Sequence, residues 1–262
     1  MRVKPTPAIA LAIFVAYGIF LILALQITGV DYDEIGDSTG NLIKGVVVPI
    51  GVGSILLAAL TSRLGWWRPA VHEESKAGPR WLLVVPALLL LTAVANIVDN
   101  GFGGNGPGLL LVLAVGVIFV GFSEELLTRG LMLVGFRGSL PEVYVWFLTS
   151  ALFGLLHGIN FISGQGAADT FQQMGFAFAF GSVLYLVRRL AGTLVVCMAL
   201  HAFWDFSVIA TTTGPAVAAT DTAPGIGQLL ILPMVLIAAY GLFKVLRQGR
   251  QAAPVPDAAG AR

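Results

Sequence analysis

The sequence predicts an all-α polytopic membrane protein: a bundle of about eight transmembrane helices with the N- and C-termini in the cytoplasm. Its composition, its long apolar runs and the placement of its basic residues predict this class. Of the 262 residues, 57% are hydrophobic and 11% are charged, whereas soluble domains carry roughly 25% charged residues. A soluble fold must keep much of its surface polar, and a bilayer removes that requirement.

Apolar runs long enough to cross a bilayer recur along the chain, since a spanning helix needs about 20 mostly apolar residues. The expected spans cover residues 7–30, 43–61, 81–99, 108–134, 143–160, 170–190, 192–210 and 226–246. Arg2 and Lys4 precede the first run, as in a signal peptide. That run is too long for a signal-peptide core and no A-x-A-like site follows it, so we expect a retained anchor.

Basic residues indicate the orientation of the chain. Of its 15 Lys and Arg residues, all except Lys44 and Arg129 fall on one side if the chain crosses eight times. Those residues are Arg2, Lys4, Arg63, Arg68, Lys76, Arg80, Arg137, Arg188, Arg189, Lys244, Arg247, Arg250 and Arg262. The opposite loops carry Asp31, Asp33, Glu34, Asp37, Asp99, Asp169 and Asp221. The positive-inside rule then places both termini in the cytoplasm. We expect a multi-pass protein of the plasma membrane.

We expect a single transmembrane domain, residues 1–247, and a disordered cytoplasmic tail, residues 248–262, rich in proline and small residues. The lipid bilayer is the first expected partner. A net charge of +1 argues against nucleic acid as a partner. A single cysteine, Cys197, excludes an internal disulfide and a cysteine-based metal cluster.

The fourth expected span contains three charges, Glu124, Glu125 and Arg129. An ionisable group inside a span costs about 2.5–3.5 kcal/mol on insertion scales, so such groups are usually functional or paired. Glu125 and Arg129 share a helix face and can pair, whereas Glu124 points about 100° away. Glu124 is then free to act as a general base. The alternative is a helix end at the membrane surface, with all three side chains solvated.

Histidines mark the fifth and seventh expected spans. Phe153 and His157 share one helix face, and so do His201 and Asp205. Asp205 can orient the imidazole, bind a metal beside it, or donate a hydrogen bond if it is protonated. The alternative is that these residues are buried polar groups that only join helices. The third histidine, His72, lies in a polar loop, and we expect it to be solvated.

Three spans therefore each offer an inward polar group: Glu124, His157, and His201 with Asp205. One carboxylate and two imidazoles can activate water, either directly or on a divalent metal such as Zn²⁺ held by these four residues.

The three clusters resemble the motifs of the CPBP family of intramembrane proteases. This family includes type II CAAX prenyl endopeptidases and bacterial abortive-infection and bacteriocin-immunity proteins. Its pattern is EExxxR, then FxxxH, then HxxxN or HxxxD, on separate membrane helices. Here Glu124-Glu125 precedes Arg129, Phe153 precedes His157, and His201 precedes Asp205, all with the family spacing. The resemblance covers about residues 108–210, and the first three spans carry no such signature.

The resemblance implies an intramembrane endopeptidase that acts on a membrane-associated peptide or protein. Glu124 and His157 would activate water, and His201 and residue 205 would stabilise the oxyanion or complete a metal site. Phe153 would pack around the site, and Glu125 with Arg129 would hold the helix. Asparagine at 205 can donate to an oxyanion, but an ionised aspartate cannot. Asp205 therefore favours a protonated acid, or a carboxylate that orients His201 or binds metal.

Two other functions compete with hydrolysis. A proton-coupled transporter also uses intramembrane Glu and His, but it favours internal repeats, and none is visible. A non-catalytic membrane immunity or scaffold protein would keep the same residues as structural pairs. The motifs of other proteases are missing, since H-E-x-x-H is absent and Gly121-Phe122-Ser123 is not followed by x-Gly.

Overall fold

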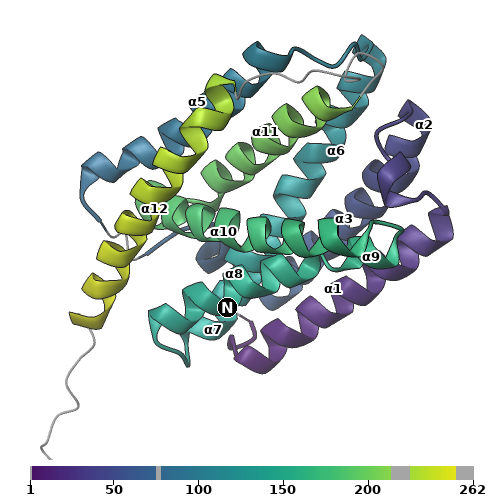
Figure 1. The fold of residues 1–262 in the computed structure, drawn as a ribbon. Helices are drawn as coiled ribbons and strands as arrows, with labels where there is room; N and C mark the ends of the chain where they lie inside the picture. Colours follow the sequence, from purple (N-terminus) through teal and green to yellow (C-terminus); the bar gives the residue numbers. More distant parts are fainter. Residues whose placement is uncertain (1, 75–77, 214–224, 252–262) are drawn as a thin grey trace, which may run out of the picture.

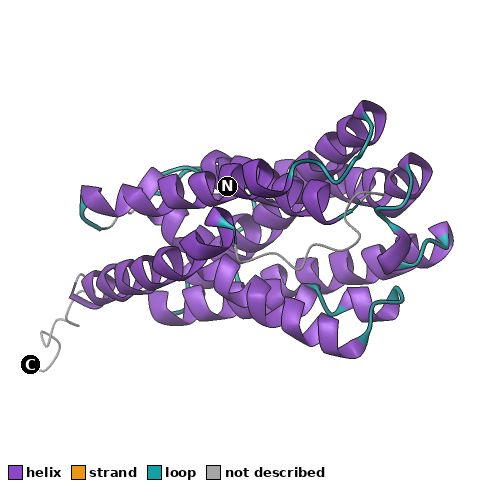
Figure 2. Cartoon of the chain, turned by 45° about the horizontal axis from the view of Figure 1, so that its top comes forward, coloured by secondary structure: helices purple, strands orange, loops and turns teal. Residues whose placement is uncertain are grey.

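The computed structural model describes residues 2–74, 78–213 and 225–251. Within these ranges the chain is helical, without a strand (Figures 1 and 2), apart from one isolated bridge between His72 and Thr193. Among the described residues, 8 helical segments are long and apolar enough to cross a membrane, which confirms the predicted fold class. They are Pro7–Thr28, Thr39–Leu64, Arg80–Asn100, Pro107–Arg137, Glu142–Ile162, Ala167–Ala191, Leu194–Thr212 and Ile226–Arg247.

Several spans are built from more than one helical element. The elements are α1 (Pro7–Thr28), η1 (Tyr32–Glu34), α2 (Thr39–Leu42), η2 (Ile43–Val47), α3 (Val48–Leu64), α4 (Trp67–Val71), η3 (Arg80–Leu83), α5 (Val84–Asn100), α6 (Pro107–Glu125), η4 (Leu126–Met132), α7 (Leu133–Arg137), α8 (Glu142–Leu156), α9 (Ile159–Ile162), α10 (Ala167–Ala191), α11 (Leu194–Thr212) and α12 (Ile226–Gln251). Because α12 continues to Gln251, the structure describes residues 248–251 of the predicted tail as helical, and residues 252–262 lie outside the described residues. Two residues used to predict the orientation, Lys76 and Asp221, also lie outside them. The orientation of the termini stays a prediction.

Local sequence signals explain where the site-bearing helices begin and end. The chain leaves α10 at Gly192, which adopts a left-handed conformation with φ 80° that glycine tolerates without steric cost. Thr193 then caps α11, because its side chain accepts a hydrogen bond from the backbone N–H of Val195. This short turn makes α10 and α11 neighbours.

Close helix packing brings the motif-bearing helices together. The most extensive contacts pair α8 with α10, α6 with α11, and α5 with both α11 and α12, as Figure 1 shows for α5, α11 and α12. Gly121 of α6 lies so close to α11 that a Cβ there would be 2.6 Å from the Met198 carbonyl oxygen. Gly154 of α8 is similarly close to the Met174 carbonyl of α10, at 2.7 Å. Small residues at such crossings are typical of membrane helix interfaces.

The outer surface of the bundle is apolar, as lipid contact requires. Large aliphatic side chains stand out from three different spans, including Ile27 (85% exposed), Val98 (74%) and Ile55 (68%). All seven residues of η4, in contrast, are buried. The polar residues of this turn, Thr128 and Arg129, therefore lie inside the protein.

Candidate active site

The fourth span changes its helical geometry immediately after the two glutamates. The α-helix ends at Glu125, and the following turn, Leu126–Met132, is a π-helix. Thr128 in this turn donates to the Glu124 carbonyl oxygen at 2.6 Å. Wide π turns are rare and frequently occur at functional sites. Glu125, directly before this turn, and Arg129, within it, are both buried.

Glu125 and Arg129 form the expected pair, and both side chains are fully buried. Arg129 Nη1 donates to Glu125 Oε1 at 2.9 Å, and the exposure of each side chain is 0%. The alternative of a solvated helix end is therefore wrong for this pair. A buried ion pair is strongly coupled, because removing either partner leaves an uncompensated charge.

His201 connects the pair to the other carboxylates. Its Nδ1 atom lies 2.9 Å from Glu125 Oε1, the same oxygen that Arg129 contacts. Since a carboxylate only accepts, Nδ1 carries a proton and donates it. The other ring nitrogen, Nε2, lies 3.4 Å from Asp205 Oδ2 and 3.8 Å from Glu124 Oε2. Glu125 therefore orients the imidazole, a role that spacing along the chain did not indicate.

His157 lies at the end of α8, where helix geometry fixes its tautomer. The last carbonyls of a helix have no intrahelical partner, and the Phe153 carbonyl is one of them. His157 Nδ1 donates to that carbonyl oxygen at 2.9 Å, because a carbonyl can only accept. The Nε2 atom of a neutral His157 therefore bears a lone pair that can accept a proton from water.

Phe153 brings the three clusters together. Its ring is 1% exposed and packs edge-on against His157, at 4.9 Å between centroids, and against His201, at 5.6 Å. The Arg129 guanidinium lies over the same ring, 4.1 Å from its centroid. Gly181 of α10 makes room for this stack, since a Cβ there would be 2.7 Å from Arg129 Nη2. The sequence-predicted residues Glu124, Glu125, Arg129, Phe153, His157, His201 and Asp205 thus all belong to one cluster.

Three residues of this cluster, Glu124, Glu125 and Arg129, have buried polar atoms without a hydrogen-bond partner. Among the described residues, such atoms are Tyr17 Oη, Glu124 Oε2, Glu125 Oε2, Arg129 Nε and Nη2, and Ser150 Oγ. Burying a polar group without a partner costs about 1–3 kcal/mol, so proteins rarely keep several together without a use for them. The site has unused hydrogen-bonding capacity of the kind that water and a peptide group require.

The metal alternative has less support. In the described part of the chain, no group of three or more His, Cys, Asp or Glu side chains is arranged to hold a metal ion. The Nδ1 atoms of both His157 and His201 are engaged with oxygen atoms, as those of metal-bound histidines commonly are, so each ring would offer Nε2 to an ion. The arrangement of the described side chains is nevertheless not that of a Zn²⁺ site, and the zinc hypothesis stays a prediction.

A second buried network supports η4, and sequence reasoning missed it. The side chain of Arg188 is fully buried and donates to the backbone carbonyls of Pro69, Ala70 and Arg129. It also pairs with Glu73, at 3.2 Å, and Glu73 pairs with Arg137, at 2.9 Å. In the sequence, Arg188 was indistinguishable from the other basic residues at inner helix ends. His72, next to Glu73, is exposed.

Residues 106–207 match the family model described as Rce1-like, type II CAAX prenyl endopeptidase Rce1-like. The match begins at Gly106, which precedes α6, and ends in α11. It contains every residue of the predicted site, whereas α1 to α5 and α12 lie outside it. No curated protein and no solved structure matches the chain.

The apolar spans and this match define the protein as a multi-pass integral membrane protein with a hydrolase domain. Residues 106–207 form a domain of the Rce1-like type II CAAX prenyl endopeptidase family.

Proposed function

We propose that this protein is an intramembrane endopeptidase and that Glu124, His157, His201 and Asp205 carry its chemistry. One observation supports the proposal above the others. Glu124 of α6 and Asp205 of α11 both face His201 Nε2, at 3.8 Å and 3.4 Å. His157 of α8 packs on the same Phe153 ring as His201. A shared interior position for acid, base and imidazole is what hydrolysis of a peptide bond requires.

Glu124 and His157 are suited to activate the attacking water. Glu124 Oε2 is buried and has no hydrogen-bond partner, so it can accept a proton from water. His157 donates through Nδ1 to Phe153 and keeps Nε2 as a second acceptor. Two acceptors can orient one water molecule toward a carbonyl carbon and take its proton, and general-base catalysis of this kind contributes about 10²–10⁴-fold.

His201 and Asp205 are suited to stabilise the negative charge that develops on the carbonyl oxygen. Glu125 holds the His201 ring through Nδ1, which already carries one proton. A doubly protonated ring therefore has its second proton on Nε2 and can donate it to an oxyanion. Asp205 and Glu124 lie close enough to compensate the charge of a doubly protonated ring. We propose that Asp205 acts as a carboxylate beside His201, because its Oδ2 atom lies 3.4 Å from Nε2 and a negative charge there stabilises the protonated ring. In this form Asp205 cannot itself donate to the oxyanion.

The substrate class follows from the family and the surroundings. The family's name describes endopeptidases acting on prenylated CAAX proteins, and we propose a membrane-associated peptide or protein as the substrate here. We also propose the plasma membrane as the location, with the basic ends of the spans on its cytoplasmic side.

The test compares purified wild type, Glu124→Gln and Glu34→Gln in detergent, each incubated with a quenched fluorescent peptide library. Glutamine conserves the shape of Glu124 and removes the base, so the rate should fall by about 10²–10⁴. Glu34→Gln removes an exposed carboxylate and should cleave like wild type. Parallel reactions with a chelator test the zinc alternative. Equal cleavage by Glu124→Gln and wild type, both correctly folded, would contradict the proposed base.

A further inference from the structure

The segment between α1 and α2 lies outside the family domain, yet it bridges the two helices that carry the histidines. The backbone N–H of Tyr32 donates to the Ser163 carbonyl at 2.7 Å, directly after α9. At the other end of the segment, a Cβ on Gly36 would be 2.5 Å from Thr213 Cγ2, directly after α11. Residues 32–36 therefore extend from the end of the His157 span to the end of the His201 helix.

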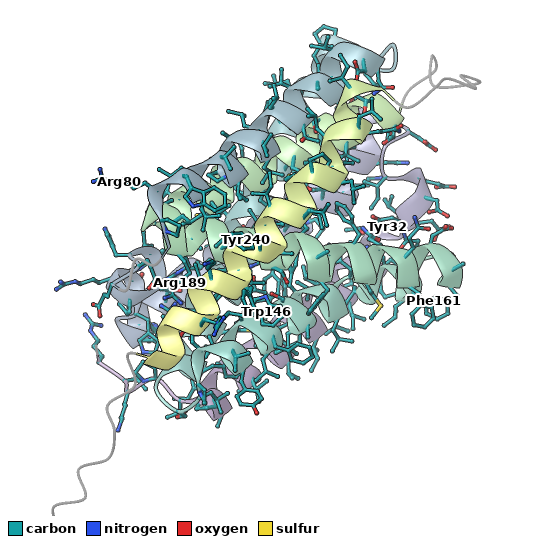
Figure 3. All side chains as sticks on the ribbon, turned by 60° about the vertical axis from the view of Figure 1, so that its left-hand side comes forward. Tyr32, Arg80, Trp146, Phe161, Arg189 and Tyr240 are labelled. Atoms are coloured by element: carbon teal, nitrogen blue, oxygen red, sulfur yellow. The ribbon has the colours of Figure 1, made fainter. Side chains whose placement is uncertain are left out.

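A directed chain of hydrogen bonds holds the Tyr32 side chain in place. Asn160 Nδ2 donates to Gln173 Oε1 at 2.9 Å, and Gln173 Nε2 donates to Tyr32 Oη at 2.9 Å. The chain starts beside the site, because the Asn160 N–H donates to the His157 carbonyl. Tyr32 lies beside α10, toward the same end of the bundle as Phe161 (Figure 3).

This direction leaves the Tyr32 hydroxyl proton available. A phenol can accept one hydrogen bond and donate another. Tyr32 accepts from Gln173, and within the described residues its own O–H has no acceptor. The hydrogen bond from Gln173 fixes the position of the Tyr32 oxygen, and the O–H proton remains available, so the hydroxyl is pre-organised to donate to an acceptor on a substrate.

The charges of the active site reach Tyr32. Burial raises the pKa of Tyr32 above its ordinary value of 10.0, and the nearby carboxylates of Asp205 and Glu124 raise it further. The phenol therefore remains protonated, and able to donate, throughout the neutral range. The geometry places Tyr32, through the hydrogen bonds of Gln173 and Asn160, at the end of the span that carries His157.

The proposed reaction lacks a donor that Tyr32 can supply. Oxyanion sites typically use more than one donor, and His201 Nε2 provides one. Where an asparagine would supply another, Asp205 as a carboxylate only accepts. We propose that Tyr32 is a further catalytic residue and that its O–H donates to the oxyanion of the tetrahedral intermediate. This inference rests on the endopeptidase function proposed above.

The step is balanced with one water molecule. The water oxygen bonds to the carbonyl carbon, its proton passes to Glu124 or His157, and the π pair moves onto the carbonyl oxygen. That oxygen accepts from His201 Nε2–H and Tyr32 O–H. The C–N bond then breaks, the nitrogen takes the transferred proton, and the carbonyl re-forms. The products are a carboxylic acid and an amine.

The test measures Tyr32→Phe against Tyr144→Phe on a library peptide that the wild type cleaves. Phenylalanine keeps the ring and removes only the hydroxyl. Loss of an oxyanion donor lowers kcat by about 10²–10³, so we expect that loss for Tyr32→Phe, with KM within about twofold. Tyr144 is 57% exposed on α8, and Tyr144→Phe should match wild type.

Two further measurements separate catalysis from packing. A phosphinate analogue of the cleaved peptide mimics the tetrahedral intermediate, and its affinity should fall in Tyr32→Phe while that of the product peptide stays unchanged. The Asp205→Asn variant has an amide that can donate to the oxyanion. In this variant, the fold-loss of kcat caused by Tyr32→Phe should be about tenfold smaller than in wild type. An unchanged kcat, or an effect confined to KM, overturns the inference. Failure of the endopeptidase function itself would instead appear in wild type, as absence of cleavage.

Discussion

The buried pair of Glu125 and Arg129 offers the strongest test of the site geometry. Their charged atoms are 2.9 Å apart and both side chains are 0% exposed. With an effective dielectric constant of about 20, two unit charges at this separation attract by about 6 kcal/mol. Desolvation offsets much of this attraction, and breaking a buried pair by removing one partner typically costs about 3–5 kcal/mol.

We therefore expect Arg129→Met and Glu125→Gln each to lower the free energy of unfolding by about 3–5 kcal/mol. The double variant removes both charges of this pair, so neither is left without its partner. Its loss of unfolding free energy should therefore be smaller than the sum of the two single losses by about 3 kcal/mol or more. Unfolding in mixed micelles with increasing denaturing detergent measures all three variants. Lys44→Met removes an exposed charge and should change stability by no more than about 0.5 kcal/mol.

Additivity would refute this reasoning. If the double variant loses the sum of the two single losses, the side chains do not interact in the folded protein.

Two other predictions concern the helix crossing and the alkaline range. Gly121→Ala places a methyl group 2.6 Å from the Met198 carbonyl oxygen. It should lower the stability measured by thermal unfolding by about 1–3 kcal/mol and slow cleavage. In the control Gly175→Ala, the added methyl group meets nothing within 4 Å, so stability should be unchanged or higher by up to about 1 kcal/mol. Equal effects of the two would contradict the α6–α11 contact. Because the pKa of Tyr32 is raised in the folded state, its contribution to stability is complete below the unfolded value of about 10 and is lost as the pH rises through the folded value. Stability curves should therefore fall less steeply above pH 10 in Tyr32→Phe than in wild type, and identical slopes would count against burial of this phenol.

Patterns that act along one helix were readable from the sequence. Apolar runs of spanning length are a property of each segment alone, and the 8 spans of the structure lie where those runs predicted them. The pairing of Glu125 with Arg129 depends only on a four-residue spacing within a helix, and it is present. The motif order from Glu124 to Asp205 likewise predicted the family, which the domain match confirms.

Contacts between helices were not readable in the same way. Arg188 and Glu73 are more than one hundred residues apart in the chain, and nothing in their spacing indicated that they pair in the interior. The hydrogen bond between Glu125 and His201 depends on how α6 lies against α11. Gly121 permits the close approach of these two helices. Tyr32 is a similar case, since its position depends on contacts with α9, α10 and the end of α11.

The sequence by itself determined that this is a membrane helix bundle, where its spans lie, and which residues carry ionisable groups into the interior. These features follow from the hydrophobic effect and from backbone hydrogen bonding within each helix, which are local to a segment. Only the tertiary structure decided which atoms of Glu124, Glu125 and Asp205 face His201, which tautomer His157 adopts, and that Tyr32 is hydrogen-bonded at the end of the His157 span. Those features depend on distances between helices, which are set by side-chain packing among segments distant in the sequence.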